Sequence, residues 1–160
     1  NRVVVEEMKG IQKPANWKIP LKKNAFEKDK TPDTKVPWIL IEDSDTRWKY
    51  EGFISVKEQW NASGASLSFG YQNCKAEIKF FGKAVQYYAF KSAKGGTVTV
   101  LLDGKNLGKF SLKSDASPHG QYYIKIFEKL NLNEDEHTLT LIGDATLSEK
   151  TIDMITIIPL

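Results

Sequence analysis

Apolar and polar residues alternate with a period of two along most of this chain. The segments Ala76–Phe80 and His137–Leu141 alternate strictly, and Thr97–Leu102 alternates at first and then ends at Asp103-Gly104. Successive side chains of a β-strand point to opposite faces, so this period is typical of strands with one buried face. An Asp-Gly pair between two such runs predicts a tight hairpin, with Leu107–Leu112 as the returning strand.

Further strand candidates follow at short intervals. They are Trp38–Ile41, Arg47–Val56, Leu67–Tyr71, Val85–Phe90, Tyr122–Phe127 and Ile152–Ile158. Turn-forming residues separate them at 61–64, 94–96 and 117–120, and no long window after Trp38 has the period of an amphipathic helix. About ten short strands, spaced by roughly 8–12 residues, predict an all-β fold: a jelly-roll β-sandwich of two antiparallel sheets.

Residues 1–37 differ from the rest of the chain in charge and in proline content. They hold nine Lys and Arg against five Asp and Glu, and four of the six prolines, whereas residues 38–160 are nearly neutral. Residues 24–33 are polar and have no apolar period. We therefore expect an irregular N-terminal extension or linker at 1–37, packing along the domain through Trp17, Ile19 and Leu21, and a jelly-roll domain at 38–160.

Length and composition exclude several other classes of protein. The 160 residues provide one ordinary domain, and no apolar run approaches the roughly 18 residues of a membrane-spanning helix. Cys74 is the single cysteine, so an internal disulfide is impossible. The net charge of +3 resides in the extension and not on the folded domain, which argues against nucleic-acid binding. Because the chain begins at Asn1, we expect a processed or excised piece.

Four stretches, in order, carry a resemblance to a known group of domains. They are Asp43–Gly52 with its Tyr-x-Gly, Ala76–Val85 with its Phe-x-Gly-x-x-Val, Gly95–Gly104 with its Gly-x-Val-x-Val-x-x-Asp-Gly, and the pair His137–Leu141 and Ile152–Ile157. Together, over residues 38–160, they resemble the galactose-binding-domain-like jelly rolls, which serve as carbohydrate-binding modules and accessory domains of bacterial carbohydrate-active enzymes. One departure is Phe53, where these domains often have Trp after the Tyr-x-Gly.

This resemblance implies a non-catalytic carbohydrate-binding module of a secreted, periplasmic or cell-surface bacterial protein. Its partners would be a glycan and the catalytic domain of a glycan-degrading enzyme, which it targets to its substrate. Two alternatives stay open: a structural jelly roll that packs against a catalytic domain without binding sugar, and a small hydrolase acting on carbohydrate. No Gly-x-Ser-x-Gly motif is present, and neither His119 nor His137 stands in a Ser-His-Asp pattern, so we assign no catalytic residue.

Sugar binding requires exposed aromatic rings with polar groups beside them. The alternation predicts that Phe69, Phe80, Phe110 and Phe127 belong to the core. Trp60 lies in a polar stretch entering a turn, and one residue of each Tyr-Tyr pair should face away from the core. If the loops at 58–64 and 114–121 share one end of the sandwich, the ligand-binding residues are Trp60, His119, Tyr122 and Tyr123. Trp48, Arg47 and Asp45 are second choices, and the last two alternatively form a structural ion pair.

Asp153 is the one carboxylate of the domain that lies in an apolar context, between Ile152 and Met154. It either faces outward from an alternating strand or supplies an oxygen ligand to a structural Ca²⁺, with Asp43 as the second ligand. Glu42, Asp45 and the 134–136 turn are further sources of oxygen, and backbone carbonyls can complete the six to eight ligands that Ca²⁺ takes. No cofactor is required by any motif, and no His or Cys spacing suggests zinc.

Overall fold

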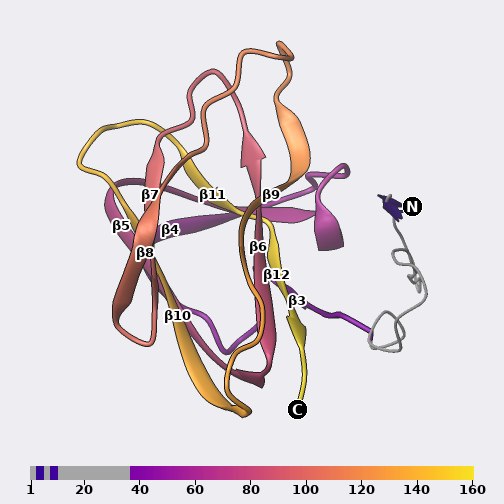
Figure 1. The fold of residues 1–160 in the computed structure, drawn as a ribbon. Helices are drawn as coiled ribbons and strands as arrows, with labels where there is room; N and C mark the ends of the chain where they lie inside the picture. The colour runs from indigo at the N-terminus through magenta and orange to yellow at the C-terminus, as the bar shows by residue number, and fades with distance from the viewer. Residues whose placement is uncertain (1–2, 6–7, 11–36) are drawn as a thin grey trace. The chain divides into compact units, whose positions relative to one another are not determined.

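The computed structural model describes residues 3–5, 8–10 and 37–160 (Figure 1). The chain forms two compact units, Asn1–Ile39 and Leu40–Leu160. In the first unit, β1 (Val3–Val5) pairs antiparallel with β2 (Met8–Gly10), so part of the extension expected to be irregular is β-structure. The predicted packing through Trp17, Ile19 and Leu21 lies outside the described residues.

Ten strands form the two antiparallel sheets of the sandwich. The larger sheet has the order β11-β5-β10-β7-β8, with β4 also paired to β5, and the smaller sheet has the order β3-β12-β6-β9. The bounds are β3 Ile39–Glu42, β4 Lys49–Lys57, β5 Ser66–Gly82, β6 Ala84–Lys91, β7 Thr97–Leu102, β8 Lys105–Ser111, β9 Gln121–Lys129, β10 Asp135–Gly143, β11 Lys150–Ile152 and β12 Met154–Ile158. This confirms the predicted all-β jelly-roll sandwich. No helix within the described residues is long and apolar enough to cross a membrane.

Two predictions about where one strand ends and the next begins were wrong. The segments expected as separate strands around Leu67–Tyr71 and Ala76–Phe80 form one 17-residue strand, β5, which continues through a bulge in which Asn73 has a φ of 52°. The segment Ile152–Ile158 is split instead. β11 pairs with β5 in the larger sheet, β12 pairs with β6 in the smaller one, and Asp153 is the residue at which the chain changes sheets.

The predicted hairpin at Asp103-Gly104 is confirmed. β7 pairs with β8 up to Leu102 and Lys105, which leaves a two-residue turn. Both turn residues have positive φ, 54° at Asp103 and 81° at Gly104, as a type I′ turn requires. Glycine meets no atom within 4 Å there, so it is present for its backbone conformation and not for space.

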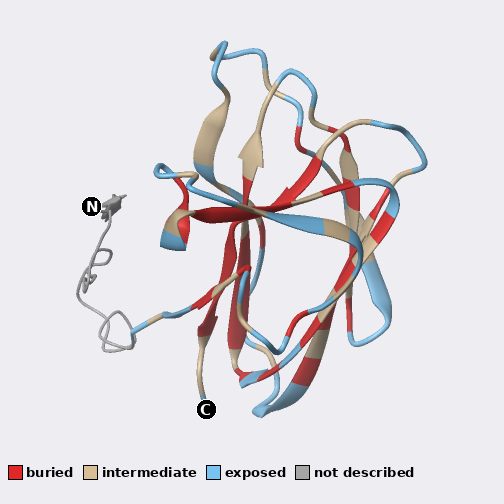
Figure 2. Ribbon diagram, turned by 180° about the vertical axis from the view of Figure 1, so that it is seen from behind, coloured by how far each residue is buried: buried red, intermediate tan, exposed pale blue. Residues whose placement is uncertain are grey.

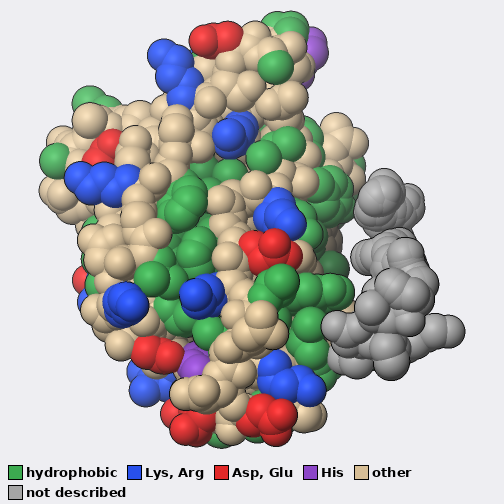
Figure 3. All heavy atoms as spheres, in the orientation of Figure 1, with side chains coloured by type: hydrophobic (Ala, Val, Ile, Leu, Met, Phe, Trp, Pro, Cys, Tyr) green, Lys and Arg blue, Asp and Glu red, His purple; other side chains and the backbone are tan. Residues whose placement is uncertain are grey.

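The core fills the space between the two sheets, as the buried residues in Figure 2 show. Its members are Ile41, Trp48, Ala76, Ile78, Phe80, Val85, Tyr87, Ala89, Val98, Val100, Leu102, Leu112, Phe127, Leu139, Leu141, Ile152, Ile155 and Ile157. Of the four phenylalanines predicted to be buried, Phe80 and Phe127 are, while Phe69 and Phe110 are half-buried. Leu107, Phe110 and Ile126 are partly buried and pack against this core. Figure 3 shows hydrophobic side chains at the surface of the sandwich.

A buried histidine ties the β7–β8 turn to the start of β10. His137 Nδ1 lies 2.6 Å from Asp103 Oδ2 and Nε2 lies 2.7 Å from the carbonyl oxygen of Asn133. Both neighbours are acceptors, so both contacts are hydrogen bonds only when the ring carries two protons. Burial lowers the pKa of His137, but the bonds to Asn133 and Asp103 outweigh it and leave this pKa above its ordinary value.

This arrangement predicts a pH-dependent stability. A histidine whose pKa is higher in the folded than in the unfolded protein stabilises the folded state. This stabilisation is complete below about pH 6.5, the ordinary histidine pKa, and is lost as the pH rises through the pKa of the folded state. We expect the melting temperature of the wild type to fall between pH 6 and pH 8.5, and this slope to shrink in His137→Gln. His119→Gln is the matched control, because His119 is exposed. An identical slope in all three proteins, measured by circular dichroism, would contradict the assignment.

Candidate functional site

Three loops surround an open hollow at one end of the sandwich. The hollow measures about 590 Å³, a size suited to a small ligand. Its walls come from the β6–β7 loop, the residues after β8, the β10–β11 loop and one position of β5. The lining residues are Tyr71, Ala93, Lys94, Gly95, Lys113, Leu147, Ser148 and Glu149. In Figure 1 these loops lie at the upper end of the sandwich.

A bulge in β5 places Tyr71 in the wall of the hollow. β4 pairs with β5 through Glu51 and Lys75, and then again through Phe53 and Gly70, so four residues of β5 stand opposite one residue of β4. Such a bulge bends the strand and re-aims its side chains. Tyr71 is 40% exposed as a result, and its ring can offer an apolar face to a ligand.

The other walls supply polar and charged groups. Lys94 and Lys113 are exposed at the edge of the hollow, and Ser148 and Glu149 are half-buried in it. Glu149 Oε1 accepts a hydrogen bond of 3.2 Å from Ser92 Oγ, which fixes the carboxylate. Donors and acceptors therefore stand around an aromatic ring, the combination by which a protein binds sugar hydroxyls and the apolar face of a sugar ring.

A row of half-buried aromatic side chains runs along the neighbouring surface. Phe69 lies two residues before Tyr71 on β5, and its ring centroid is 6.4 Å from that of Phe90. Phe90 in turn lies 4.7 Å from Tyr122, whose hydroxyl is 3.3 Å from Gln59 Oε1. This contact joins β9 to the loop that carries Trp60.

The structure brings part of the predicted ligand-binding set together. Tyr122 belongs to the aromatic row, and Trp60 is 77% exposed one residue beyond Gln59. Tyr123 is exposed with a φ of 59°, a conformation that is rare for a bulky residue and sits where β9 bulges against β6. His119 is exposed in the adjoining turn, where its backbone N–H donates to Ser117 Oγ.

The second-choice residues do not form a ligand platform. Trp48 is only 6% exposed, donates its indole N–H to the Glu42 carbonyl and stacks on Tyr50, so its assignment to the ligand site was wrong. Its two charged neighbours, Arg47 and Lys49, are exposed, while the tryptophan between them faces the core. Arg47 and Asp45 form a bidentate ion pair, with Nε and Nη2 each 2.9 Å from a carboxylate oxygen, as the alternative interpretation proposed.

The acidic residues that suggested a metal lie together at the β11–β12 junction. Asp153 is completely buried, so the interpretation of an outward-facing strand residue is wrong. Its Oδ1 accepts a hydrogen bond from Ser63 N, while Oδ2 is buried and accepts none within the described part of the chain. Burial, followed by the nearby charges of Glu42 and Asp43, raises the pKa of Asp153 well above its ordinary value.

These residues fit a hard cation in part. Asp43 turns its two oxygens to Ser66 and Ser68, at 2.6 and 2.8 Å, whereas the Glu42 carboxylate points to Ser63, which also contacts Asp153. Among the described residues no three His, Cys, Asp or Glu side chains converge on one point. Glu42 and Asp153 both contact Ser63, so a Ca²⁺ ion beside this residue would take these two carboxylates as ligands and its remaining oxygens from the backbone and water.

The sequence analysis missed most of the residues that line the hollow. Tyr71 had been placed in an ordinary strand, and the residues of 144–149 were not singled out because no motif marks them. The signal that was available is Gly95-Gly96, interpreted as a turn. A Cβ on Gly95 would lie 1.9 Å from the Leu112 carbonyl oxygen, so the glycine lets two of the hollow's walls approach closely.

Comparisons with known proteins give likenesses in structure alone. No family model matches the chain, and no curated protein matches it. A family 35 carbohydrate-binding module from Clostridium thermocellum superposes with a TM-score of 0.58 at 14% identity, covering 74% of this chain and 97% of the module. The CBM35 from Cellvibrio japonicus Abf62 gives 0.55 at 11%, covering 76% and 95%.

A larger enzyme contains the same fold. The cycloisomaltooligosaccharide glucanotransferase of a Paenibacillus species, solved with cycloisomaltoheptaose, gives a TM-score of 0.61 at 11% identity and covers 77% of this chain. The chain spans only 18% of the length of that enzyme. At such identities the shared feature is the fold alone, the jelly-roll β-sandwich that the sequence predicted.

Proposed function

We propose that this chain is a non-catalytic carbohydrate-binding module and that the hollow at the loop end holds its glycan. The observation that carries the proposal is the combination of an exposed tyrosine and several hydrogen-bonding side chains in the wall of one open hollow. Two solved proteins that superpose on this chain over nearly their whole length are named as carbohydrate-binding modules. This likeness supports carbohydrate binding by this chain. The aromatic row, with Trp60, His119, Tyr122 and Tyr123, would extend the binding surface along a longer glycan.

The role we propose for such binding is targeting. A module that holds a polysaccharide raises the local concentration of any catalytic domain linked to it, without contributing a catalytic group. The enzyme neighbour, of which this fold is a small part, supports a setting beside a catalytic domain. A secreted, periplasmic or cell-surface location in a bacterium follows from that role, because polysaccharide substrates lie outside the cell.

We include a structural Ca²⁺ ion at the junction of β11 and β12 in this proposal. Asp153 Oδ2 and the Glu42 carboxylate would bind the ion, which would neutralise the negative charge that is buried there. The ion would have no part in recognising sugar, because neither Glu42 nor Asp153 lines the hollow.

Binding tests the proposal directly. A panel of soluble glucans, xylan, mannan, galactan and cycloisomaltoheptaose is titrated by calorimetry, first with the wild type. We expect saturable binding to at least one member, weakened tenfold or more in Tyr71→Ala, because loss of a stacked ring costs about 1–3 kcal/mol by analogy with base stacking. Tyr122→Ala and Trp60→Ala should weaken binding of long chains more than that of short ones.

The control for these variants is Phe81→Ala. Phe81, like Tyr71, is an exposed aromatic residue of β5, with 58% of its surface accessible against 40% for Tyr71. It lies beside the β5–β6 turn and does not line the hollow. Equal losses of affinity in Phe81→Ala and Tyr71→Ala would place the glycan elsewhere. Full affinity in Tyr71→Ala would remove the hollow as the site.

One observation favours the alternative of a structural accessory domain. Phe81, Leu130 and Leu160 are 58%, 45% and 58% exposed, near the turn in which Lys83 N donates to the Ile158 carbonyl and Lys83 O accepts from Leu132 N. None of the three lines the hollow. Large apolar side chains exposed close to one turn fit a surface that packs against another domain. A folded wild type that binds no member of the panel would favour this alternative.

A further inference from the structure

A lysine is completely buried behind the wall of the hollow. Lys150 begins β11 opposite Gly70 of β5, and its side chain has 0% exposure. The stem of the side chain passes close to Gly96 and Gly143, where an added Cβ would come within 3.0 Å of it. Lysine is among the residues least often buried, because removing an ammonium group from water is costly unless it is paired.

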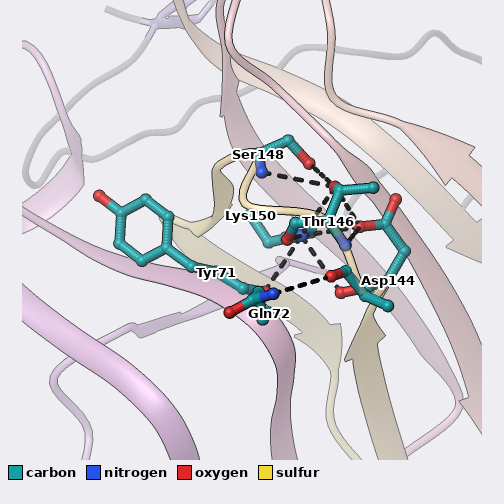
Figure 4. A network of polar contacts seen from close by, with 7 residues as sticks. Tyr71, Gln72, Asp144, Thr146, Ser148 and Lys150 are labelled. Carbon is teal, nitrogen blue, oxygen red and sulfur yellow. Dashed lines mark hydrogen bonds and ion pairs between the residues drawn. The ribbon is translucent and has the colours of Figure 1, made fainter.

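The ammonium group lies between the two segments that shape one side of the hollow (Figure 4). Nζ is 2.8 Å from Asp144 Oδ1 and donates to the carbonyl oxygens of Thr146 and Tyr71 at 2.8 and 3.0 Å. The Asp144 carbonyl and Thr146 Oγ1 lie at 3.3 and 3.4 Å. Five oxygens thus face one nitrogen, and the three N–H donors of the group each have a short partner.

The same two segments make few other contacts with each other. Asn73 N donates to the Asp144 carbonyl at 2.8 Å, and Gln72 Nε2 reaches the Ala145 carbonyl at 3.3 Å. Within the β10–β11 loop, Thr146 donates to Asp144 through its backbone and side chain, and Thr146 also contacts Ser148. The Lys150 ammonium is the positively charged group at the centre of this network, and Tyr71, Ser148 and Glu149, which belong to the same two segments or follow them, line the hollow.

We propose that Lys150 is a positioning residue of the glycan-binding site: its ammonium group acts as a built-in cation that holds the 144–149 loop against the Tyr71 bulge. The inference rests on the proposed function for the glycan, and on the contacts above for the positioning. An arrangement of carbonyl, hydroxyl and carboxylate oxygens around one point is what a loop-organising metal ion receives. Here the cation is covalently attached, so the shape of this wall does not depend on a dissociable ion.

The ion pair is consistent with this role. The bond from Lys150, followed by that from Thr146, holds the pKa of Asp144 far below its ordinary range, so this carboxylate is charged at neutral pH. Lys150 does not itself line the hollow. It can therefore affect binding only through the placement of Tyr71 and the loop.

The experiment removes the positive charge of Lys150 by substitution and then supplies it again with a small cation. In the full chain, Lys150→Met keeps an unbranched stem, and Lys150→Ala leaves space for an n-propylammonium ion, which supplies the three carbons and the nitrogen that were removed. We expect Lys150→Met to bind the tightest member of the glycan panel at least tenfold more weakly. We expect millimolar propylammonium to restore affinity to Lys150→Ala and to leave the wild type unchanged. Lys109→Met, an exposed lysine on β8, is the matched control.

Hydrogen exchange separates positioning from folding and from the proposed function. In Lys150→Met, faster exchange confined to residues 71–74 and 144–149 supports the inference, whether or not the wild type binds a glycan. Wild-type affinity in Lys150→Met overturns it, and so does unchanged exchange in both segments. Should Lys150→Met not fold, the same measurements are made on Asp144→Asn, which weakens the pair and keeps the lysine. A wild type that binds no glycan refutes the proposed function and leaves the exchange result to decide the positioning.

Discussion

Calcium is expected to raise the melting temperature of the wild type and to leave that of Asp153→Asn unchanged. An ion present at a hundred times its dissociation constant stabilises the folded state by about 2.7 kcal/mol. For a unit of this size that corresponds to roughly 5–10 °C. Asp153→Asn keeps the acceptor for Ser63 N and the size of the side chain, but it removes the charge that would bind the ion. Thermal melts in calcium and in EDTA give the comparison.

The control for this prediction is Asp45→Asn. Asp45 is an acidic residue of the same region, but it is occupied by its ion pair with Arg47. The calcium-dependent rise should therefore persist in this variant. If Asp153→Asn retains the full rise, the ion binds elsewhere, and if the wild type shows no rise, the acidic cluster is a buried polar group of the fold and not a metal site.

Gly95→Ala is expected to produce the largest loss of stability among single-methyl changes in the loops. Its Cβ would lie 1.9 Å from the Leu112 carbonyl oxygen and 2.8 Å from Lys113 N, and both are backbone atoms that cannot rotate away. Forcing extra volume into a packed site costs about 1–3 kcal/mol or more, which is a fall in melting temperature of roughly 2–12 °C. Because Gly95 and Lys113 both line the hollow, the affinity for glycan should fall as well.

Gly104→Asn provides the comparison for that variant. Gly104 has a φ of 81° and open space around it, and asparagine is the residue that best tolerates such a turn after glycine. Its melting temperature should stay within about a degree or two of the wild type, since surface changes rarely exceed 0.5 kcal/mol. Equal losses in the two variants would contradict the close approach to Leu112 as the reason for glycine at position 95.

The alternation of residues was sufficient for the fold because it reports burial on one face of each strand. It found the hairpin at Asp103-Gly104 and strand positions within two residues of most observed bounds. It could not find the change of sheet at Asp153, because a strand that crosses between sheets keeps its period. Nor could it find the bulge at 71–74, where no glycine or proline interrupts the sequence from Tyr71 to Cys74.

At the candidate site, too, some features could be predicted from the sequence and others could not. Exposed Trp60 could be predicted from its polar neighbours, whereas buried Trp48 was misjudged because its charged neighbours, Arg47 and Lys49, point away from the core. Lys150 gave no signal at all, since its burial depends on carbonyl oxygens from two distant segments. Backbone acceptors of this kind do not appear in a sequence, and they decide where the hollow lies.

The pairing of both β10 and β11 with β5 makes the loop between them suitable for redesign. Both strands lie along β5, one on either side of the 144–149 loop, so that loop leaves and rejoins the sheet at a fixed register. Residues inserted after Leu147, which is 73% exposed, would lengthen the wall of the hollow without shifting any strand. The sandwich therefore provides a site at which loops of different length can be grafted, and under the proposed function such grafts would change the glycan preference.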